Sequence, residues 1–304
     1  MLSLQLEASL KAVEDAGLRP ADIDGVIPYA GGVVTEDLIT NLGLPDPRFS
    51  AVTPLGGASC VAAVQCAVMA IAAGVCNHVL IPVGRNGASQ GRIGTQMQQM
   101  PQFRAVGEFE MPLGAIAPAQ LYAPMARRHM ELYGTTSRQF GEIAVSTRAN
   151  AILNGNAIMM KLISIEDHQA SRMISDPFRL LDCSLESDGA CAIVVSGADH
   201  ARDLRKRPIL VMGIAEGHPD SPSVITQRPD MTRLGIAKAA PRAFAMAGVT
   251  HGDIDVAEIY DCFTYIVMCQ LEECASLRIS ASARRERAAP SSRVARSGLA
   301  ASCR

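Results

Sequence analysis

The chain has 304 residues, of which 48% are hydrophobic and 19% are charged, and its formal net charge is −2. This composition is typical of a globular protein with a large core, and it excludes an intrinsically disordered chain. The small net charge gives no electrostatic reason to expect binding to nucleic acid or to an anionic membrane surface.

The first ninety residues alternate between helical and extended patterns. An amphipathic helix that ends near Gly17 is predicted from the apolar residues Leu2, Leu4, Leu6, Leu10, Ala12 and Val13. Strands are predicted at "DGVIPYA", "RFSAVTPL" and "NHVLIPVG", and helices at "EDLITNLG" and over Ala58–Ala73. The alternation of strand and helix predicts parallel strand pairing with helices on both faces of the sheet.

Residues 85–115 are rich in Gly, Gln and Met and show no clear period, so we expect a lid, a binding loop or a dimerisation loop. Two strong helical patterns follow, "PAQLYAPMARRHMELYG" and "TSRQFGEIAVSTRANAIL", with Thr136 or Ser137 as the cap of the second. Strands are predicted at "DGACAIVVSG" and "RPILVMGIAEG", and a helix over residues 230–247.

An internal repeat is the strongest sign of organisation. "AGLRPADIDGVIPY" (16–29) matches "AGVTHGDIDVAEIY" (247–260) at one constant offset, from the helix end through Asp-Ile-Asp to a final Tyr. A shared way of stopping helices is the simpler explanation. The length of the match favours two related α/β halves.

The helix predicted over residues 58–73 carries almost no polar side chain. Such a helix must be covered on all sides, so we expect it to lie between layers. Gly56 and Gly57 precede it and allow a tight turn and the close approach of a ligand. The unpaired N–H groups at a buried helix start suit an oxyanion on a thioester carbonyl. Gly56 and Gly57 are therefore candidate substrate-binding residues.

Cys60 lies in the first turn of this helix, where the pKa of a thiol is commonly lowered, and is a candidate catalytic residue. It also shares a helix face with Val64, Ala67 and Ile71, which fits a small buried hydrophobe, and both interpretations stay open. The nine cysteines form no C-x-x-C pair and lie mostly in apolar runs. We therefore expect no metal site, reduced thiols and a cytoplasmic protein. No apolar run is long enough for a membrane span.

Four stretches resemble the thiolase superfamily when taken in order. They are "GGASCVAAVQCAVMAIAAGVCNHVLIPVG", "ARRHMELYGTTSRQFGEIAVSTRANAILNGNA", "PFRLLDCSLESDGACAIVVSGADHARDL" and "AEIYDCFTYIVMCQLEE". The resemblance covers residues 1–273 and is closest to the lipid-transfer-protein thiolases and their aldolase-like relatives. It implies a duplicated α/β fold in five α-β-α-β-α layers. It also implies acyl-CoA chemistry, in which a C–C bond next to a thioester carbonyl is made or broken.

The resemblance also assigns roles to single residues. True thiolases have a nucleophilic Cys at the start of the buried helix, and Gly57 occupies that place here, so Cys60 is not the family nucleophile. This departure argues against an acyl-enzyme and fits the aldolase-like branch. Tyr260 begins "YDCF" and resembles a Tyr that transfers a proton or polarises a carbonyl in aldolase-like enzymes. Asp261 is a candidate partner that orients it. Simple packing roles for Tyr260 and Asp261 are the alternatives.

The chain departs from the family at both ends. It lacks the first strand of the family and a catalytic His segment after residue 273, so we expect a second half that is incomplete. We expect an N-terminal thiolase-like half over residues 1–200 with a loop region at 85–180, and a partial C-terminal half over 201–273. The Ala-, Ser- and Arg-rich residues 274–304 are expected to be a disordered tail outside the family, and we hypothesise an out-of-frame reading of a GC-rich gene.

These observations predict an acetyl-CoA acetyltransferase-like enzyme or a retro-aldolase. An inactive fragment that binds acyl-CoA or a protein partner is the alternative. The expected substrate is a coenzyme A thioester, with no permanently bound cofactor. The resemblance further implies a homodimer and a small OB-fold acyl-CoA-binding protein as a partner.

Overall fold

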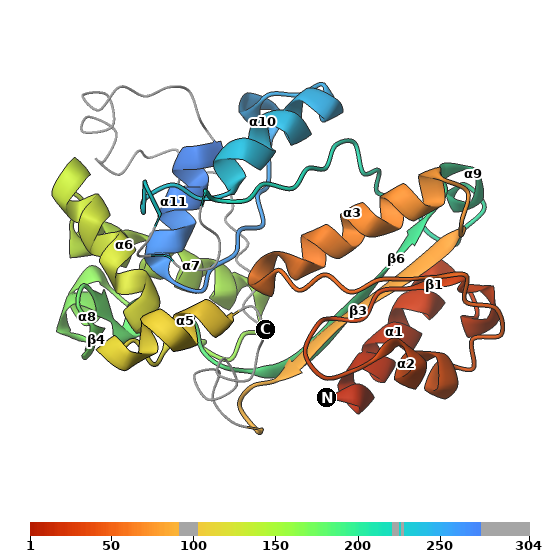
Figure 1. The fold of residues 1–304 in the computed structure, drawn as a ribbon, viewed down its shortest axis with the longest axis horizontal. Helices are drawn as coiled ribbons and strands as arrows, with labels where there is room; N and C mark the ends of the chain where they lie inside the picture. Colours follow the sequence, from red (N-terminus) through yellow and green to blue (C-terminus); the bar gives the residue numbers. More distant parts are fainter. Residues whose placement is uncertain (91–102, 221–224, 226–227, 275–304) are drawn as a thin grey trace. The chain divides into compact units, whose positions relative to one another are not determined.

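The computed structural model describes residues 1–90, 103–220, 225 and 228–274. The chain forms two compact units, each built from two separate stretches of sequence (Figure 1). The first unit holds residues 1–90 and 187–212, and the second holds residues 91–186 and 213–304. The boundary predicted at residue 200 separates duplicated halves rather than compact units, and it stays a prediction. The tail predicted over residues 274–304 lies, apart from its first residue, outside the described residues.

A four-stranded sheet organises the first unit. Its strand order is β2-β1-β3-β6, with β1 parallel to β2 and β3, and β6 antiparallel to β3. The strands are β1 Gly25–Val26, β2 Phe49–Ser50, β3 His78–Asn86 and β6 Asp188–Ser196. The helices are α1 Leu2–Ala16, α2 Thr35–Leu42, α3 Ser59–Ala72 and α9 Ala198–Ala201, with 3-10 turns η1 Pro20–Asp22 and η2 Gly56–Ala58. The predicted parallel pairing of the first three strands is confirmed.

Helices cover both faces of this sheet, as predicted. Successive side chains of a strand point to opposite faces. On one face, Leu80 of β3 packs with Val13 of α1 and Leu38 of α2. On the other face, Val79 packs with Ala67 of α3. Figure 1 shows α1 and α2 on one side of β3 and α3 on the other. All five of these side chains are buried, so each face has its own apolar layer.

The predicted enclosure of α3 on all sides is wrong. Ala67 and Ala70 are buried against the sheet, whereas Val61 and Met69 are 59% and 55% exposed. One sheet can cover only one side of a helix, and the opposite side of α3 stays open in the described part of the chain. An almost wholly apolar sequence therefore indicates a helix that could be covered on all sides. Whether other elements pack on its second side depends on the rest of the chain.

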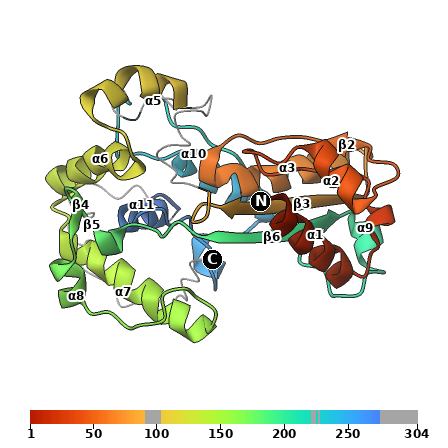
Figure 2. The ribbon, with the colours of Figure 1, turned by 90° about the horizontal axis from the view of Figure 1, so that it is seen from below.

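The second unit is mainly helical (Figure 2). Its helices are α5 Arg104–Phe109, α6 Pro118–Tyr133, α7 Ser137–Asn154, α8 Ile165–Ala170, α10 Ile236–Ala247 and α11 Thr264–Cys274. Its two short strands, β4 Met173–Ser175 and β5 Phe178–Arg179, are antiparallel, and it has 3-10 turns η4 Met111–Leu113, η5 Leu180–Asp182 and η7 His251–Asp253. The helices predicted for α6 and α7 are confirmed, and the helix predicted over residues 230–247 is confirmed from Ile236 onward.

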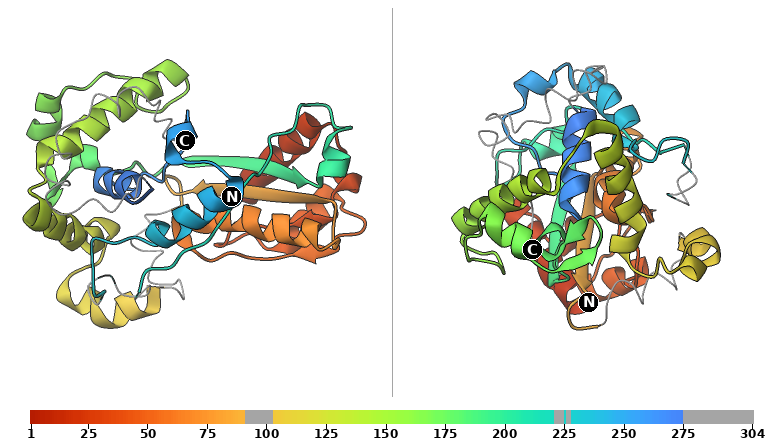
Figure 3. Two further views of the ribbon diagram at one scale, coloured as in Figure 1. Left: turned by 90° about the horizontal axis from the view of Figure 1, so that it is seen from above. Right: turned by 90° about the vertical axis from the view of Figure 1, so that its left-hand side faces the viewer.

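Aromatic rings form the centre of the second unit. The rings of Phe178 and Phe263 are stacked, with centroids 4.8 Å apart and planes 8° from parallel. Phe140 of α7 and Tyr265 of α11 pack against Phe178, and all four side chains are buried. The core thus joins α7, β5 and α11, which is the blue helix next to the green ones in Figure 3.

Two sequence predictions fail in the second half of the chain. Residues 207–217 form no strand, and Ile209 and Leu210 are 97% and 70% exposed. A strand needs a neighbouring strand for its hydrogen bonds, whereas the backbone that lies against this run, beside Gly213 and Gly217, is that of α10 and its first turn. The loop predicted over residues 85–115 is partly helical, because α5 and η4 lie within it. Residues 91–102 of that loop are outside the described residues.

The two copies of the predicted repeat share the same local structure in their first part, which both explanations of the match require. Helix α1 ends at Gly17 and α10 ends at Gly248, both with a left-handed backbone. A 3-10 turn follows each of them. Asp22 accepts a hydrogen bond from the Arg19 backbone N–H, and Asp253 accepts one from Thr250, both at 2.8 Å. The likeness weakens where β1 forms in the first copy. Ala257, the counterpart of Val26, is a single β-bridge residue, and residues 255–260 form no strand, so two related halves stay a prediction.

Candidate functional site

The turn that leads into α3 is held by two side chains. The Thr53 hydroxyl donates a hydrogen bond to the Ser59 carbonyl at 2.8 Å, and the Leu55 backbone N–H donates to the Ser59 hydroxyl at 3.0 Å. Gly56 has a φ of +60°, in the left-handed region that favours glycine, and a Cβ there would meet nothing within 4 Å. Gly57 is exposed. The amino end of α3 therefore presents backbone on its surface, as a substrate-binding turn requires.

Cys60 lies one turn further along, and the pKa of its thiol moves opposite to the expectation. Burial raises the pKa, and the nearby Cys191 thiol adds to the rise. The lowering expected at a helix start is thus outweighed by desolvation. Tyr29 lies at the end of the segment after β1. Burial raises the pKa of the Tyr29 phenol, and the nearby Cys60 adds to the rise. Whether Cys60 is catalytic stays a prediction.

Tyr260 begins the segment that leads into α11, and this segment is held by its backbone. The Ser184 backbone N–H donates a hydrogen bond to the Cys262 carbonyl at 3.1 Å. The Gln270 side-chain amide, on α11, donates to the Tyr260 carbonyl at 2.6 Å. These bonds fix the backbone on both sides of Asp261. The side chains of this segment are therefore presented from a defined scaffold.

The side chains of this segment combine a phenol with a thiol. Tyr260 is 48% exposed, and its phenol lies close enough to the Cys262 thiol to act on the pKa of that thiol. Burial raises the pKa of Cys262 to about 12, and the Tyr260 phenol opposes this shift. The negative charge of the neighbouring Asp261 raises the pKa of Cys262 further. Cys262 is therefore a neutral thiol near pH 7. The role of the Tyr260 phenol in proton transfer stays a prediction.

A second phenol and a cation lie near this thiol. Tyr122 of α6 packs against Phe263, with ring centroids 5.3 Å apart. Burial raises the pKa of Tyr122; the nearby Cys262 adds to the rise and Arg228 opposes it. Burial lowers the pKa of Arg228, while Tyr122 and Glu110 raise it. Two phenols, a thiol and a guanidinium thus gather around residues 260–263.

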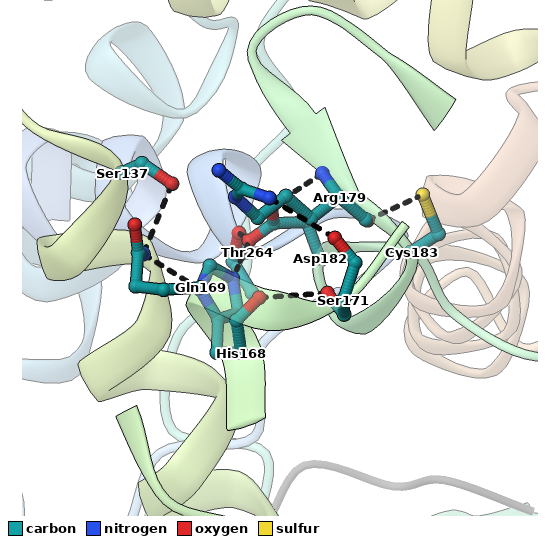
Figure 4. Close-up of polar contacts among 8 residues, drawn as sticks. All are labelled: Ser137, His168, Gln169, Ser171, Arg179, Asp182, Cys183 and Thr264. Carbon is teal, nitrogen blue, oxygen red and sulfur yellow. Dashed lines mark hydrogen bonds and ion pairs between the residues drawn. The ribbon is translucent and has the colours of Figure 1, made fainter. Parts of the chain in front are cut away.

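A buried polar network lies at the start of α11 (Figure 4). The Oδ1 atom of Asp182 accepts hydrogen bonds from His168 Nε2 at 2.8 Å and from Thr264 Oγ1 at 2.7 Å. The Oδ2 atom accepts from the Arg179 backbone N–H at 2.7 Å. The side chains of His168 and Asp182 are completely buried. A buried carboxylate with three donors is well satisfied, and it fixes η5, α8 and α11 to one another.

The structure groups the predicted site residues by unit. Gly56, Gly57 and Cys60 lie together at the amino end of α3 in the first unit, and Tyr260 and Asp261 lie together before α11 in the second. The catalytic and substrate-binding roles of these five residues stay predictions.

Several residues around these groups escaped the sequence analysis. They are Thr53, Ser59, Tyr122, Arg228, His168, Asp182 and Thr264. The motif "YDCF" could have suggested Cys262, because it stands two places after Tyr260. No sequence signal marks His168 or Asp182, since their partners are set by tertiary packing.

The described part of the chain offers no group of His, Cys, Asp or Glu that could hold a metal ion. Among the described helices, none has the length and apolar character needed to cross a membrane.

Comparisons with known proteins give similar sequences and a similar structure. The family model described as "Thiolase C-terminal domain-like" matches residues 217–287, beyond the limit of 273 predicted for the resemblance. The chain is 38% identical over 281 residues to the 17-hydroxy-3-oxo-4-pregnene-20-carboxyl-CoA lyase of Mycobacterium tuberculosis, covering 90% of this chain and 73% of that protein. It is 37% identical over 282 residues to the steroid side-chain-cleaving aldolase of Thermomonospora curvata, covering 90% of this chain and 72% of that protein.

A solved structure described as "Ltp2-ChsH2(DUF35) aldolase" has the same fold. Its TM-score with this chain is 0.83 at 36% sequence identity, and the match covers 93% of this chain and 74% of that chain.

Proposed function

The chain belongs to the thiolase superfamily, in the branch of lipid-transfer-protein thiolases and aldolase-like enzymes, and we propose that it is a retro-aldolase acting on an acyl-CoA thioester. The predicted resemblance and the thiolase-like fold are confirmed by these relatives. The substrate class is a CoA thioester with a hydroxyl group on the carbon β to the thioester carbonyl. A bulky polycyclic group on that carbon fits the lyase and aldolase relatives.

One observation carries the choice of retro-aldol cleavage over thiolysis. The amino end of α3 holds Gly56 and Gly57, and the nearest thiol of that helix, Cys60, has a pKa raised by burial. Thiolysis through an acyl-enzyme needs a reactive thiolate as nucleophile. A glycine-led turn followed by a neutral thiol does not supply one. It fits a reaction in which no covalent acyl-enzyme forms.

The proposed step balances without a second substrate. The β-hydroxyl group loses its proton, and its oxygen becomes the carbonyl oxygen of one product as the bond between the α and β carbons breaks. The electron pair of that bond passes to the α carbon, and the resulting thioester enolate takes up a proton. We assign Tyr260 to proton transfer, because its half-exposed phenol lies near a neutral thiol and its backbone carbonyl is held by Gln270.

A second protein is part of the proposal. The aldolase structure that matches this chain is described with two components, Ltp2 and ChsH2(DUF35). We infer that this chain also works with a small partner that contributes to acyl-CoA binding, as the resemblance implied. A homodimer stays a prediction.

The test separates the two chemistries by their use of CoA. The chain, alone and with a DUF35-type protein, is incubated with 17-hydroxy-3-oxo-4-pregnene-20-carboxyl-CoA, and the products are followed by mass spectrometry. Retro-aldol cleavage gives one carbonyl compound and one shortened acyl-CoA without free CoA. Thiolysis consumes one CoA in each turnover. Products that form only when CoA is added would refute the proposed chemistry.

Replacing Tyr260 tests its assigned role. Tyr260→Phe is expected to lower kcat by about 10²–10⁴-fold, the usual range for loss of a general acid or base. Tyr133→Phe is the matched control, since Tyr133 packs against His129 in the same unit. An unchanged kcat in Tyr260→Phe would overturn the assignment. Thermal stabilisation by the thioester without turnover, with or without the partner, would support the inactive alternative.

A further inference from the structure

We propose that Asp182, bonded to His168 and Thr264, is a positioning residue that sets the geometry of the Tyr260–Phe263 segment. The proposal rests on the role of Tyr260 in the proposed function. It gives a role to the side chains of Asp182, His168 and Thr264, which take no direct part in the proposed reaction.

Burying the Asp182 carboxylate costs free energy. A carboxylate with no solvent exposure is stable only when its oxygens are well satisfied. Asp182 receives three donors, from His168, Thr264 and the Arg179 backbone, at 2.7–2.8 Å. Each donor comes from a different element, namely α8, α11 and β5. The carboxylate therefore has one position relative to all three.

The His168 ring is itself held in place. Its Nε2 donates to Asp182, so Nδ1 is left as an acceptor, and the Gln169 side-chain amide lies 3.0 Å from it. The same amide nitrogen of Gln169 donates to the Ser137 hydroxyl at 3.2 Å (Figure 4). The ring also lies against Gly141, where a Cβ would come within 3.1 Å of Nδ1. The imidazole can neither flip nor shift without losing contacts.

Thr264 links the network to the segment that carries Tyr260. Thr264 is the first residue of α11 and directly follows Phe263. Phe263 forms an antiparallel bridge with Cys183, the neighbour of Asp182 in the chain. The hydroxyl of Thr264 and this bridge therefore attach the start of α11 to η5 side by side. A shift of Asp182 would move the segment that carries Tyr260, and displacements of about 1 Å at a reacting group can cost about 100-fold in rate.

The experiment uses Thr264→Val, which keeps the β-branched shape and removes one donor to Asp182. Tyr260 is observed directly in the full chain carrying ¹³C-labelled tyrosine, with its signal assigned from Tyr260→Phe. We expect a shifted or broadened Tyr260 signal and a kcat lowered by about 10–100-fold with little change in KM. Thr264→Ser keeps the hydroxyl and is expected to restore both readouts. His168→Gln should show the same signal change as Thr264→Val.

The matched control is His129→Gln. His129 is also buried in this unit and contacts α11, through Glu272 near its far end at 3.1 Å and through an edge-on packing with the Tyr265 ring. Its two ring nitrogens are taken by Thr135 and Glu272, so it makes no hydrogen bond to Asp182 or Thr264. The His129→Gln variant should have a lower melting temperature and an unchanged Tyr260 signal. An unchanged Tyr260 signal in folded Thr264→Val and His168→Gln would overturn the proposal, as would the same change in His129→Gln. Absence of turnover in the wild type would instead count against the proposed function, because the Tyr260 signal does not depend on turnover.

Discussion

At the scale of single residues, the His168 ring can occupy its buried position because its neighbour Gly141 in α7 has no side chain. A Cβ added at Gly141 would lie 3.1 Å from Nδ1 and 3.2 Å from Cγ of the ring. Glycine within a helix costs about 1 kcal/mol relative to alanine. Helix α7 therefore gives up propensity at Gly141 and gains room for an imidazole that Asp182 holds from the other side.

Gly141→Ala should destabilise the chain although alanine favours helices. The added methyl group meets a fixed ring, and overpacking of this kind costs about 1–3 kcal/mol. Urea unfolding should show a lower midpoint for this variant. Gly107→Ala in α5 is the control, because its nearest neighbour would be Met111 Sδ at 3.8 Å. Equal stability of the two variants would contradict the packing described at His168.

The carboxylate of Asp22 makes the stability of the first unit depend on pH. It accepts hydrogen bonds from the backbone and the guanidinium of Arg19, which lower its pKa from 3.8 to about 2. A pKa lower in the folded state means that the carboxylate stabilises the fold above about pH 4, and this stabilisation is lost as the pH falls toward 2. Because the pair is partly exposed, we expect only about 1 kcal/mol. The free energy of unfolding of Asp22→Asn should therefore lie below wild type at pH 7, with the gap closing in acid. A gap independent of pH would argue against this.

At the scale of elements, the sequence predicts what local periodicity determines. Helices α1, α6 and α7 and strand β3 follow from their own spacing of apolar residues, which carries enough information to place them. Residues 207–217 have the composition of a strand, but the described residues pair no strand with them, and composition cannot report that. Helix α3 was predicted correctly as a helix and wrongly as enclosed, because the covering layer is a property of distant residues.

The candidate site divides in the same way. Gly56, Gly57 and Tyr260 could be found because short motifs mark them. The network at Asp182 could not, since its partners His168 and Thr264 are 14 and 82 positions away. Hydrogen bonds of this reach are set by the packing of α8 and α11 and leave no pattern in the sequence.

The one-sided burial of α3 gives a prediction for a pair of variants. Ala67→Gln places a polar side chain at a position with no solvent exposure, and should cost about 2 kcal/mol or more in the free energy of unfolding. Met69→Gln changes a 55% exposed side chain and should stay within about 0.5 kcal/mol of wild type. Chemical denaturation measures both. Similar large losses in the two variants would show that α3 is covered on both sides in solution.

At the scale of the whole molecule, the surface carries more apolar side chains in one run than a stable isolated protein usually shows. Ile209, Leu210, Val211 and Met212 are consecutive and 97%, 70%, 48% and 59% exposed. Contiguous exposed apolar residues promote association. These four side chains bury little surface, so they contribute little to the free energy of unfolding. The solubility of the chain and its stability should therefore respond separately to changes in this run.

Ile209→Lys should raise the temperature at which light scattering begins and increase the soluble fraction, with no fall in the melting temperature. The removed side chain is almost fully exposed, so no core contact is lost, and the exposed apolar run becomes shorter. Thr40→Lys, at an exposed position of α2, adds the same charge without removing an apolar group and should give a smaller gain. Equal gains would assign the effect to charge alone. A lower melting temperature in Ile209→Lys would mean that the run is packed in solution, as a strand in a completed sheet would be.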